Sequence, residues 1–350
     1  MITTLRLQNF RSYADMTFGF DEGVTIIVGP NASGKTNLLE GVLVSALGGS
    51  YRARDAELVA FEAPWARLDA QTATTARIVK LQAENGFKKS FEVDGKPLAR
   101  LTQQRTMPVV LFEPNHLMLL SGSPDMRRSF LDDLIEQTVP GFGATRRHYK
   151  RVLSQRNTLL KRNPHGIKDQ LFVWNLRLSE LGGQIARERI KLIDYFNQHV
   201  SELYASLAAR DNTVELQYLS KFHPETYETA LLRKLEENLE LEVARGYTLY
   251  GPHRDDVAAL LNGHLIQESA SRGETRTLVL ALKILELQLL EKSRDQKPIL
   301  LLDDVFSELD AARRQALTQF VRTYQTFITT TDADIVSEHF HGSHKIIDLS

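Results

Sequence analysis

The stretch VTIIVGPNASGKTNLL, residues 24–39, constrains the fold of this chain more than any other. Its β-branched start predicts a short buried strand, and the apolar spacing that follows Lys35 predicts a helix. Between them, residues 29–36 match G-x-x-x-x-G-K-[ST], the spacing of a phosphate-binding loop. In that context, backbone N–H groups and the helix dipole bind phosphate oxygens. The alternative is a glycine turn before an ordinary helix, and the flanking strand and helix favour the phosphate loop.

The loop supplies groups for both phosphate and metal binding. Lys35 is expected to reach the β- and γ-phosphates, which gives it a catalytic as well as a binding role, and the Thr36 hydroxyl is expected to ligate Mg²⁺. The expected cofactors are therefore ATP and Mg²⁺. The residues expected to surround the phosphates are Gly29, Pro30, Asn31, Ala32, Ser33, Gly34, Lys35, Thr36 and Asn37.

Composition excludes several classes of protein. The chain has 350 residues, and its 43 basic and 44 acidic residues nearly cancel, so that only local patches of charge can indicate a partner. The absence of cysteine excludes disulfides and thiolate metal sites and favours a reducing compartment. There is neither a signal-peptide pattern nor an apolar run of membrane-spanning length, so a cytoplasmic protein without a membrane partner is expected.

Strand and helix patterns divide the chain into three parts. Residues 1–122 are rich in strand patterns, including an antiparallel pair joined at Asn85. Residues 123–246 are mostly helical, with one long amphipathic helix or two helices joined near Gly182. Residues 247–350 return to alternating strands and helices. The expected fold is an α/β head, with a mixed sheet and an antiparallel β layer, built from both ends of the chain around a mainly helical insertion.

A second constellation follows the apolar strand pattern of residues 298–302, which ends in Asp303 and Asp304. In a parallel sheet, this strand end lies at the edge where the phosphate loop opens. Asp303 is expected to anchor Mg²⁺ opposite Thr36, and Asp304 to position or deprotonate the attacking water. Taken alone, the pair fits a solvated strand end or a helix cap equally well. The presence of the phosphate loop favours the catalytic interpretation.

A serine–glycine turn, Ser271-Arg272-Gly273-Glu274, precedes a strongly apolar helix. The turn offers a second place for backbone N–H groups to meet a phosphate. Ser271 and Glu274 also fit a capping box, and the two interpretations are compatible. Elsewhere, Arg11 is a candidate nucleotide contact, with a surface salt bridge as the equal alternative.

Residues 137–168 contain no Asp or Glu but many Arg and Lys. On a helix, these side chains form a basic stripe that can neutralise DNA phosphates without reading sequence. The alternative is a solvated face, or a face paired with the acidic residues 236–242. The candidate DNA contacts are Arg146, Arg147, Lys150, Arg151 and Arg156.

The order of these motifs looks like that of ATP-binding-cassette heads in chromosome-maintenance proteins, and nearly the whole chain resembles the RecF family. The YKRVLSQRNTLLK and GPHRDD blocks are not general to cassette ATPases and carry most of this resemblance. The other matching blocks are LQNFRSY, GPNASGKTNLLE, GSPDMRRSFLD, SRGETRTLVLALK and LLLDDVFSELD.

The resemblance implies an ATP-driven homodimer in which two heads enclose two ATP molecules. Lys35 and Thr36 of one copy would then face Ser271 and Gly273 of the other, and Asp310 would help to signal across the dimer. Most cassette heads carry Glu at the position of Asp304, and the shorter side chain implies slow hydrolysis. Thr329-Thr330-Thr331 occupies the place where a switch histidine is expected, and Thr330 is the candidate there. Apart from the resemblance, His253 and Arg254 are expected to brace the two lobes rather than to catalyse.

The resemblance also implies a function. The family acts in DNA damage repair, the SOS response and replication-fork maintenance, as a weak DNA-dependent ATPase. It binds gaps or junctions of single- and double-stranded DNA and, with RecO and RecR, assists RecA loading. The alternatives are the nucleotide-binding subunit of a transporter and an SMC-like chromosome-organising head.

Overall fold

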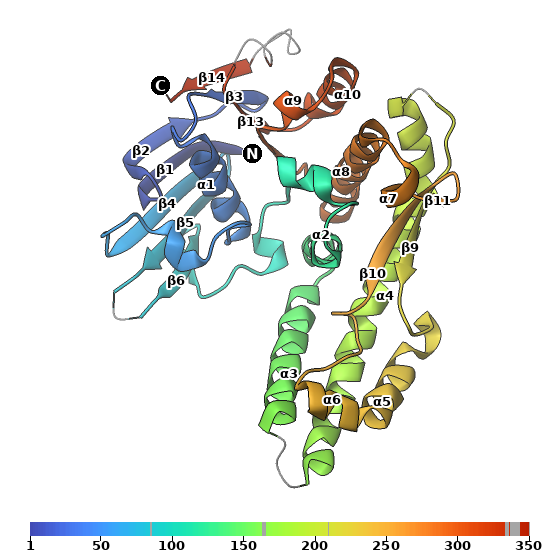
Figure 1. Cartoon of the computed structure of the whole chain (residues 1–350). Coiled ribbons are helices and arrows are strands. Elements are labelled where there is room, and N and C mark those ends of the chain that lie inside the picture. Colours follow the sequence, from blue (N-terminus) through green and yellow to red (C-terminus); the bar gives the residue numbers. More distant parts are fainter. Residues whose placement is uncertain (85, 163–165, 209, 333–335, 337–343, 350) are drawn as a thin grey trace. The chain divides into compact units, whose positions relative to one another are not determined.

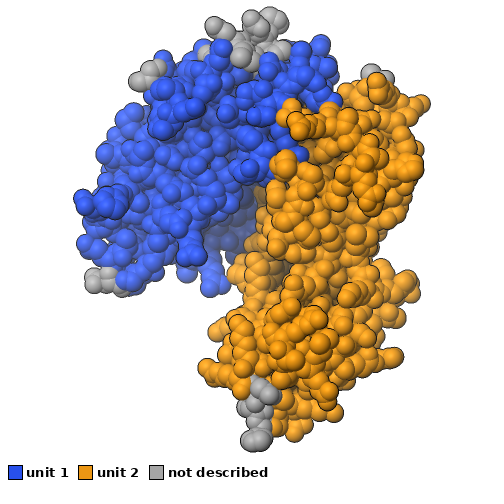
Figure 2. Space-filling model, in the orientation of Figure 1, with its two compact units in different colours: residues 1–117, 286–350 blue, residues 118–285 orange. Residues whose placement is uncertain are grey.

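The computed structural model describes residues 1–84, 86–162, 166–208, 210–332, 336 and 344–349 (Figure 1). Asn85 lies outside these residues. The chain forms two compact units: unit 1 comprises Met1–Leu117 and Glu286–Ser350, and unit 2 comprises Met118–Leu285 (Figure 2). The predicted boundary between residues 246 and 247 differs from this division. Residues 247–285 belong to unit 2 because strand β10 (Asp256–Leu261) hydrogen-bonds to β9 (Val214–Leu219) in an antiparallel pair.

Unit 1 contains a five-stranded sheet in the order β14-β3-β13-β12-β8. All its described strand pairs are parallel, whereas a mixed sheet was expected. Its central strands read as continuous apolar runs because both faces are covered. The parallel arrangement brings the carboxyl ends of β3 and β12 to one edge. The strands are β3 (Val24–Val28), β8 (Val109–Phe112), β12 (Ile299–Asp303), β13 (Thr326–Thr330) and β14 (His344–Asp348).

The second sheet of unit 1 confirms the antiparallel β layer. Its order is β2-β1-β4-β5-β6-β7, and every pair is antiparallel. Strand β4 was not predicted, because two of its three buried positions are alanines and give a weak apolar alternation. The strands are β1 (Ile2–Phe10), β2 (Tyr13–Gly19), β4 (Trp65–Thr72), β5 (Ala76–Gln82), β6 (Lys88–Val93) and β7 (Lys96–Leu98).

Helix α1 (Lys35–Leu47) shares one core with strands of both sheets. Leu38 and Val42 of the helix are fully buried in a cluster that also contains Leu7 of β1 and Phe327 of β13. A Cβ atom at Gly41 would lie 2.9 Å from the Leu7 side chain, so glycine allows the helix to approach β1 closely. This packing fixes the helix whose first turn follows the phosphate loop.

Unit 2 is helical with a small sheet, β11-β10-β9. Helix α4 (Ile167–Ala208) is continuous through Gly182, which decides between one helix and two. A Cβ atom on Gly183 would lie 2.2 Å from the Glu228 side chain, so these glycines admit a neighbouring helix rather than end α4. Strand β9 was expected to be helical, and that prediction was wrong. Its alternating buried residues are Val214 and Leu216. Their backbone groups exchange hydrogen bonds with the side chains of Ser201 and Asn197 on α4.

The remaining elements connect these parts. No helix of the described residues combines the length and the apolar character needed to cross a bilayer. The other elements are α2 (Pro124–Thr138), α3 (Phe142–Arg162), α5 (Tyr227–Glu237), α6 (Leu239–Arg245), β11 (His264–Leu265), α7 (Ile266–Ser269), α8 (Arg272–Arg294), α9 (Val305–Glu308), α10 (Ala311–Val321), and the 3₁₀ turns η1 (Asp55–Leu58), η2 (Gln103–Arg105), η3 (Pro114–Met118) and η4 (Pro224–Thr226).

Candidate nucleotide-binding site

The phosphate loop joins β3 to α1, and only glycine fits at its two key positions. Gly34 has φ +103°, and a Cβ atom there would lie 2.9 Å from the Tyr13 hydroxyl. A Cβ atom on Gly29 would lie 2.6 Å from the Ser33 hydroxyl oxygen. Helix α1 begins at Lys35, directly after the loop, so its first N–H groups face the concave side. The loop therefore has the close backbone curvature that cradles a phosphate.

Two side chains of the loop face inward. The Lys35 ammonium donates hydrogen bonds to the carbonyl oxygens of Gly29 at 2.7 Å and Pro30 at 2.8 Å. The Ser33 hydroxyl is buried and has no hydrogen-bond partner among the described residues. An unpaired buried hydroxyl in the same loop as an ammonium group fits an anion that satisfies both, because an unpaired buried polar group costs free energy.

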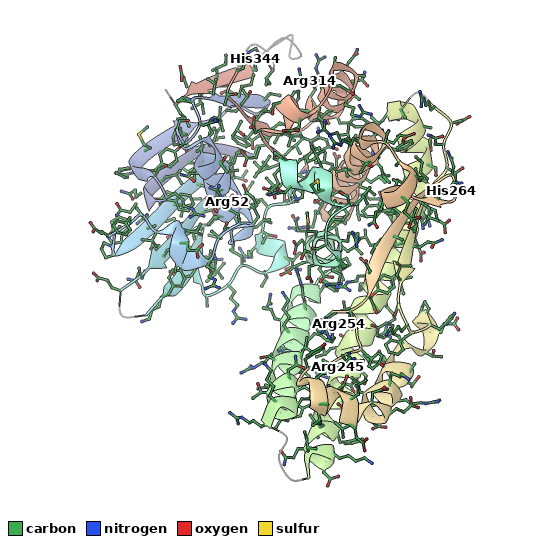
Figure 3. The ribbon with its side chains drawn as sticks, in the orientation of Figure 1. Arg52, Arg245, Arg254, His264, Arg314 and His344 are labelled. Atoms are coloured by element: carbon green, nitrogen blue, oxygen red, sulfur yellow. The ribbon has the colours of Figure 1, made fainter. Side chains whose placement is uncertain are left out.

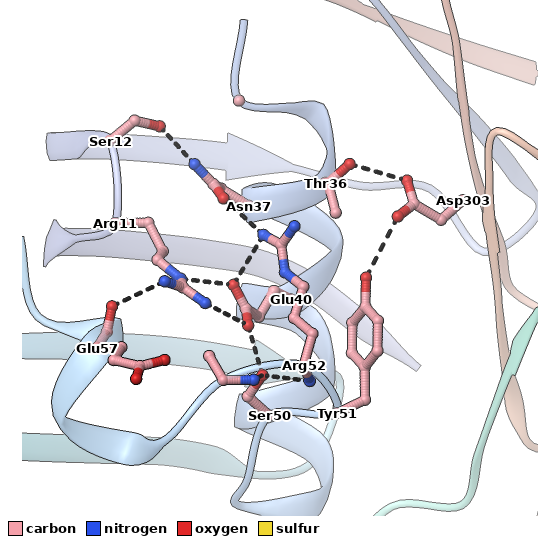
Figure 4. Close-up of polar contacts among 12 residues, drawn as sticks. Arg11, Ser12, Thr36, Asn37, Glu40, Ser50, Tyr51, Arg52, Glu57 and Asp303 are labelled. Atoms are coloured by element: carbon pink, nitrogen blue, oxygen red, sulfur yellow. Dashed lines mark hydrogen bonds and ion pairs between the residues drawn. The ribbon is translucent and has the colours of Figure 1, made fainter. Parts of the chain in front are cut away.

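The structure brings Thr36 and Asp303 together, as predicted. The Thr36 hydroxyl donates to the Asp303 carboxylate at 3.0 Å (Figure 4). A hydroxyl and a carboxylate side by side are the oxygen ligands that Mg²⁺ prefers, with phosphate oxygens and water completing its shell. The residues present therefore fit a magnesium ion shared with a nucleotide.

Two further hydroxyls hold Asp303, and neither was predicted to do so. The Thr329 hydroxyl donates to Asp303 at 2.7 Å, and the Tyr51 hydroxyl donates at 3.2 Å. Thr329 lies opposite Asp303 in the register of β13 and β12, a placement that only the strand order reveals. Thr330, the candidate switch residue, points elsewhere and donates to the Asp332 carbonyl at 3.0 Å. The contact between β13 and Asp303 therefore runs through Thr329.

Asp304 occupies a special backbone position. Its φ is +53°, in the left-handed region, where a residue other than glycine is strained. Its N–H donates to the Thr329 hydroxyl at 2.9 Å, and its carboxylate accepts one hydrogen bond, from Ser307 at 3.2 Å. Asp304 is partly exposed and lies directly after the strand that ends in Asp303.

Beside the phosphate loop, Glu40 holds two arginines. Its carboxylate is fully buried and accepts hydrogen bonds from Arg11 at 2.8 Å and from Arg52 at 3.0 Å (Figure 4). Burial alone would raise the pKa of Glu40, but the hydrogen bonds from Arg11, Arg52 and Ser50 outweigh it and hold the pKa below its ordinary value. Arg11 therefore forms a salt bridge, which was the alternative to a nucleotide contact. Arg52 also donates to Asn37 at 2.7 Å.

The serine–glycine turn starts helix α8 in unit 2. The Ser271 N–H and hydroxyl both donate to the Glu274 carboxylate, and the Glu274 N–H donates back to the Ser271 hydroxyl at 3.2 Å. The capping-box interpretation is thereby confirmed. Ser271 is exposed and Gly273 is half-buried. In unit 1, Asp310 caps α10 by accepting from the Arg313 N–H at 3.0 Å and also contacts the Arg313 guanidinium.

The basic stripe on α3 is smaller than predicted. Arg156 is fully buried and pairs with Glu242, which is also fully buried, so its assignment as a DNA contact was wrong. Arg146 is only 16% exposed and pairs with Asp132, Asp133 and Glu136, so its charge is compensated and the same assignment fails. Of the five candidates, Arg147, Lys150 and Arg151 remain exposed, and Arg147 lies 3.5 Å from the Glu136 carboxylate.

The fold and the site together define the class. A parallel sheet, an antiparallel β layer and a phosphate loop whose threonine meets the carboxylate of a neighbouring strand form a P-loop ATPase head of the ATP-binding-cassette type. The family described as the RecF/RecN/SMC N terminal domain matches residues 1–347.

Individual proteins are also similar. A protein named DNA replication and repair protein RecF from Acetivibrio thermocellus is 33% identical, over 99% of this chain and 97% of its own length. Another of that name, from Heliobacterium modesticaldum, is 36% identical, over 94% of this chain and 92% of its own. A solved structure of the recombination mediator protein RecF-ATPrS in the RecFOR pathway superposes with a TM-score of 0.88, at 28% identity, over 99% of this chain and 96% of that one. The chain belongs to the RecF family.

Proposed function

We propose that this chain is an ATP-dependent DNA-binding ATPase of recombinational repair and replication-fork maintenance. The observation that carries the proposal is the contact of the Thr36 hydroxyl with Asp303 at 3.0 Å, beside a loop that has no space for a Cβ atom at Gly29 or Gly34. The names of the relatives, DNA replication and repair protein RecF, support the biological role.

In this proposal, the loop N–H groups, the Ser33 hydroxyl and the Lys35 ammonium bind the phosphates of ATP. Thr36 and Asp303 would hold Mg²⁺, which when bound neutralises charge that develops on the phosphate oxygens. Asp304 accepts a proton from the attacking water or orients it. The loop residues Pro30, Asn31, Ala32 and Asn37 shape the phosphate cradle, and Arg11 lies beside it on Glu40.

We further propose that ATP closes a homodimer on DNA. Ser271 and Gly273 of one copy would contact the nucleotide bound to Lys35 of the other, with Asp310 at the interface. ATP and DNA would then strengthen one another's binding because both favour the closed dimer. Arg147, Lys150 and Arg151 are the remaining candidates for phosphate contacts at a gap or junction.

The same proposal includes the partners RecR, RecO and RecA in a bacterial, nucleoid-associated setting. The similar solved structure, which is that of a recombination mediator protein in the RecFOR pathway, supports this placement.

Two substitutions test the proposal. Lys35→Ala should lose ATP binding and ATP-driven dimerisation, because the phosphates lose their cation. Asp304→Asn should bind ATP and dimerise, yet hydrolyse it about 10²- to 10⁴-fold more slowly, because only the water-activating step is removed. Light scattering with and without ATP and a gel shift on gapped duplex provide the measurements, with Thr330→Val as a matched control. A wild-type chain that stays monomeric with ATP and binds no DNA would overturn the clamp, and normal hydrolysis by Asp304→Asn would overturn the assignment of the base.

A further inference from the structure

A pocket of ≈ 390 Å³ opens in unit 2, between the loop after β9 and the loop before β10. Aromatic rings of Tyr218, Phe222 and Tyr250 line it, and so do two basic residues, Lys221 and Arg254. Its volume lies within the range of small-ligand sites. Arg254 belongs to the GPHRDD block, which the nucleotide site does not use. Figure 3 labels Arg254 in this unit.

The two cations lie against aromatic faces rather than carboxylates. The Lys221 ammonium is 5.0 Å from the centroid of the Tyr250 ring, and the Arg254 guanidinium is 5.1 Å from that of Tyr247. Both basic side chains are exposed, and neither has an ion pair among the described residues. Each is therefore available to an anion. A second ammonium, that of Lys234, lies 5.9 Å from the Tyr250 centroid and is paired with Glu237.

The two carboxylates of the pocket are already compensated. Asp256 accepts two hydrogen bonds from Arg127, at 2.8 and 2.7 Å. Asp255 accepts from the hydroxyls of Tyr218 at 2.8 Å and Tyr227 at 2.7 Å. Burial raises the pKa of Asp255, so that its negative charge is held less firmly than usual. The uncompensated charge at the mouth of the pocket is therefore positive.

We propose that this pocket binds one unpaired nucleotide of single-stranded DNA. The base stacks on Tyr250 and Phe222, and the adjoining phosphates contact Lys221 and Arg254. Aromatic faces combined with cations characterise single-strand sites, because every base has a face to stack while the backbone needs only charge. In a duplex the bases are stacked inside, so only an unpaired base can enter. The inference rests on the proposed DNA-binding function and names where an unpaired strand would be held.

An acidic peptide also complements Lys221 and Arg254. The aromatic lining favours the nucleotide, because a base can stack on an aromatic ring as well as place its phosphate near a cation, whereas a carboxylate would contact the cations alone. The two occupants differ in one measurable respect: binding of the nucleotide depends on the aromatic ring of Tyr250 as well as on the two charges.

Fluorescence anisotropy of a labelled oligo-dT with the full-length protein tests the site. Tyr250→Leu should weaken binding about 5- to 100-fold, from the stacking energy of one base. Tyr250→Phe keeps the ring and should stay within about twofold of wild type. The double change Lys221→Gln/Arg254→Gln should reduce the salt slope of log K by about 1.4, since each single-strand contact contributes about 0.7. Arg245→Gln removes an exposed charge outside the pocket lining and should leave the slope unchanged.

Photocrosslinking of 5-iodo-deoxyuridine DNA to the wild-type chain adds a readout that needs no variant, and crosslinks should map to residues 218–222 or 247–254. Wild-type affinity in Tyr250→Leu together with crosslinks elsewhere would overturn the inference while leaving ATP-dependent DNA binding intact. A wild-type chain that binds no DNA, gapped or single-stranded, would overturn both proposals. Binding of poly-glutamate, but not of oligo-dT, that is lost in the double variant would make the pocket a peptide site and overturn the nucleotide assignment.

Discussion

The ion pair between Arg156 and Glu242 gives the sharpest quantitative prediction. Both side chains are fully buried, with Nη2 of Arg156 2.6 Å from the carboxylate. The same guanidinium donates to Asn175 at 2.7 Å and to Thr248 at 2.8 Å. Arg156→Met replaces the apolar stem of the side chain but removes the guanidinium, so the Glu242 carboxylate stays buried without its cation. Removing one partner of a buried pair costs about 3–5 kcal/mol, far more than an exposed pair.

Urea unfolding of the full chain measures this cost. The chain has two tryptophans, Trp65 in unit 1 and Trp174 in unit 2. In a Trp65→Phe background, fluorescence therefore reports unit 2 alone. With a denaturant slope of about 3 kcal/mol per M, the expected loss lowers the midpoint by about 1–2 M. Arg156→Met/Glu242→Gln should lose less than Arg156→Met, because no uncompensated charge is left buried.

Arg151 on the same helix is the matched control, because it is exposed. Arg151→Met should change stability by less than about 0.5 kcal/mol. On duplex DNA, the salt slope of log K should fall by about 0.9 in Arg151→Met and stay constant in Arg156→Met, since only an exposed cation releases counterions. A midpoint in Arg156→Met within about 0.3 M of wild type would refute the reasoning about the buried pair. A reduced slope in that variant would restore Arg156 as a DNA contact.

Three further predictions concern other sites. Burial lowers the pKa of His253 to about 4, below its ordinary value of 6.5. As the pH falls, His253 therefore takes up its proton in the unfolded chain at a higher pH than in the folded chain. The free energy of unfolding of unit 2 should therefore fall by about 3 kcal/mol as the pH drops from 6.5 to 4, and His253→Gln should flatten that pH profile by about one proton. Thr329→Val should slow ATP hydrolysis about 10- to 100-fold, from the loss of a hydrogen bond to a carboxylate, whereas Thr330→Val should not, as a steady-state assay will show. Lys150→Gln should weaken binding uniformly across duplex sequences, as a gel shift on unrelated duplexes will show.

Much of the nucleotide site could be predicted because its motifs are local. The loop, its strand and its helix are contiguous, and the partner carboxylate ends a strand of unmistakable apolar character. The contacts that Asp303 makes with neighbouring elements could not be predicted. Thr329 and Tyr51 contact Asp303 across 26 and 252 residues of chain, respectively. No spacing rule encodes such contacts, because strand order and loop path decide them.

In unit 2, a prediction from a local sequence pattern was wrong. The charge pattern of α3 predicted an exposed basic stripe, but charge alone does not distinguish a solvated arginine from one buried opposite a carboxylate. The alternative pairing with residues 236–242 was correct for Arg156, whose partner is Glu242. Amphipathic spacing was informative here: Tyr149, Val152 and Leu160 are buried on α3, and Arg156 lies on the same face.

The two carboxylates at the end of β12 are distinguished by their surroundings rather than by their chemistry. Asp303 is 8% exposed and accepts from three hydroxyls, which stabilise its charge and fix its direction. Asp304 occupies a left-handed backbone position, and among the described contacts its carboxylate accepts one hydrogen bond, from the Ser307 hydroxyl. The Thr329 hydroxyl donates to the first carboxylate and accepts from the N–H of the second residue, so one side chain fixes both positions. In the proposed mechanism, Asp303 would hold Mg²⁺ through the acceptor capacity that its three hydroxyl partners leave free, and Asp304 would accept the proton. The proposed division of roles between Asp303 and Asp304 therefore depends on β13 as much as on the strand that carries them.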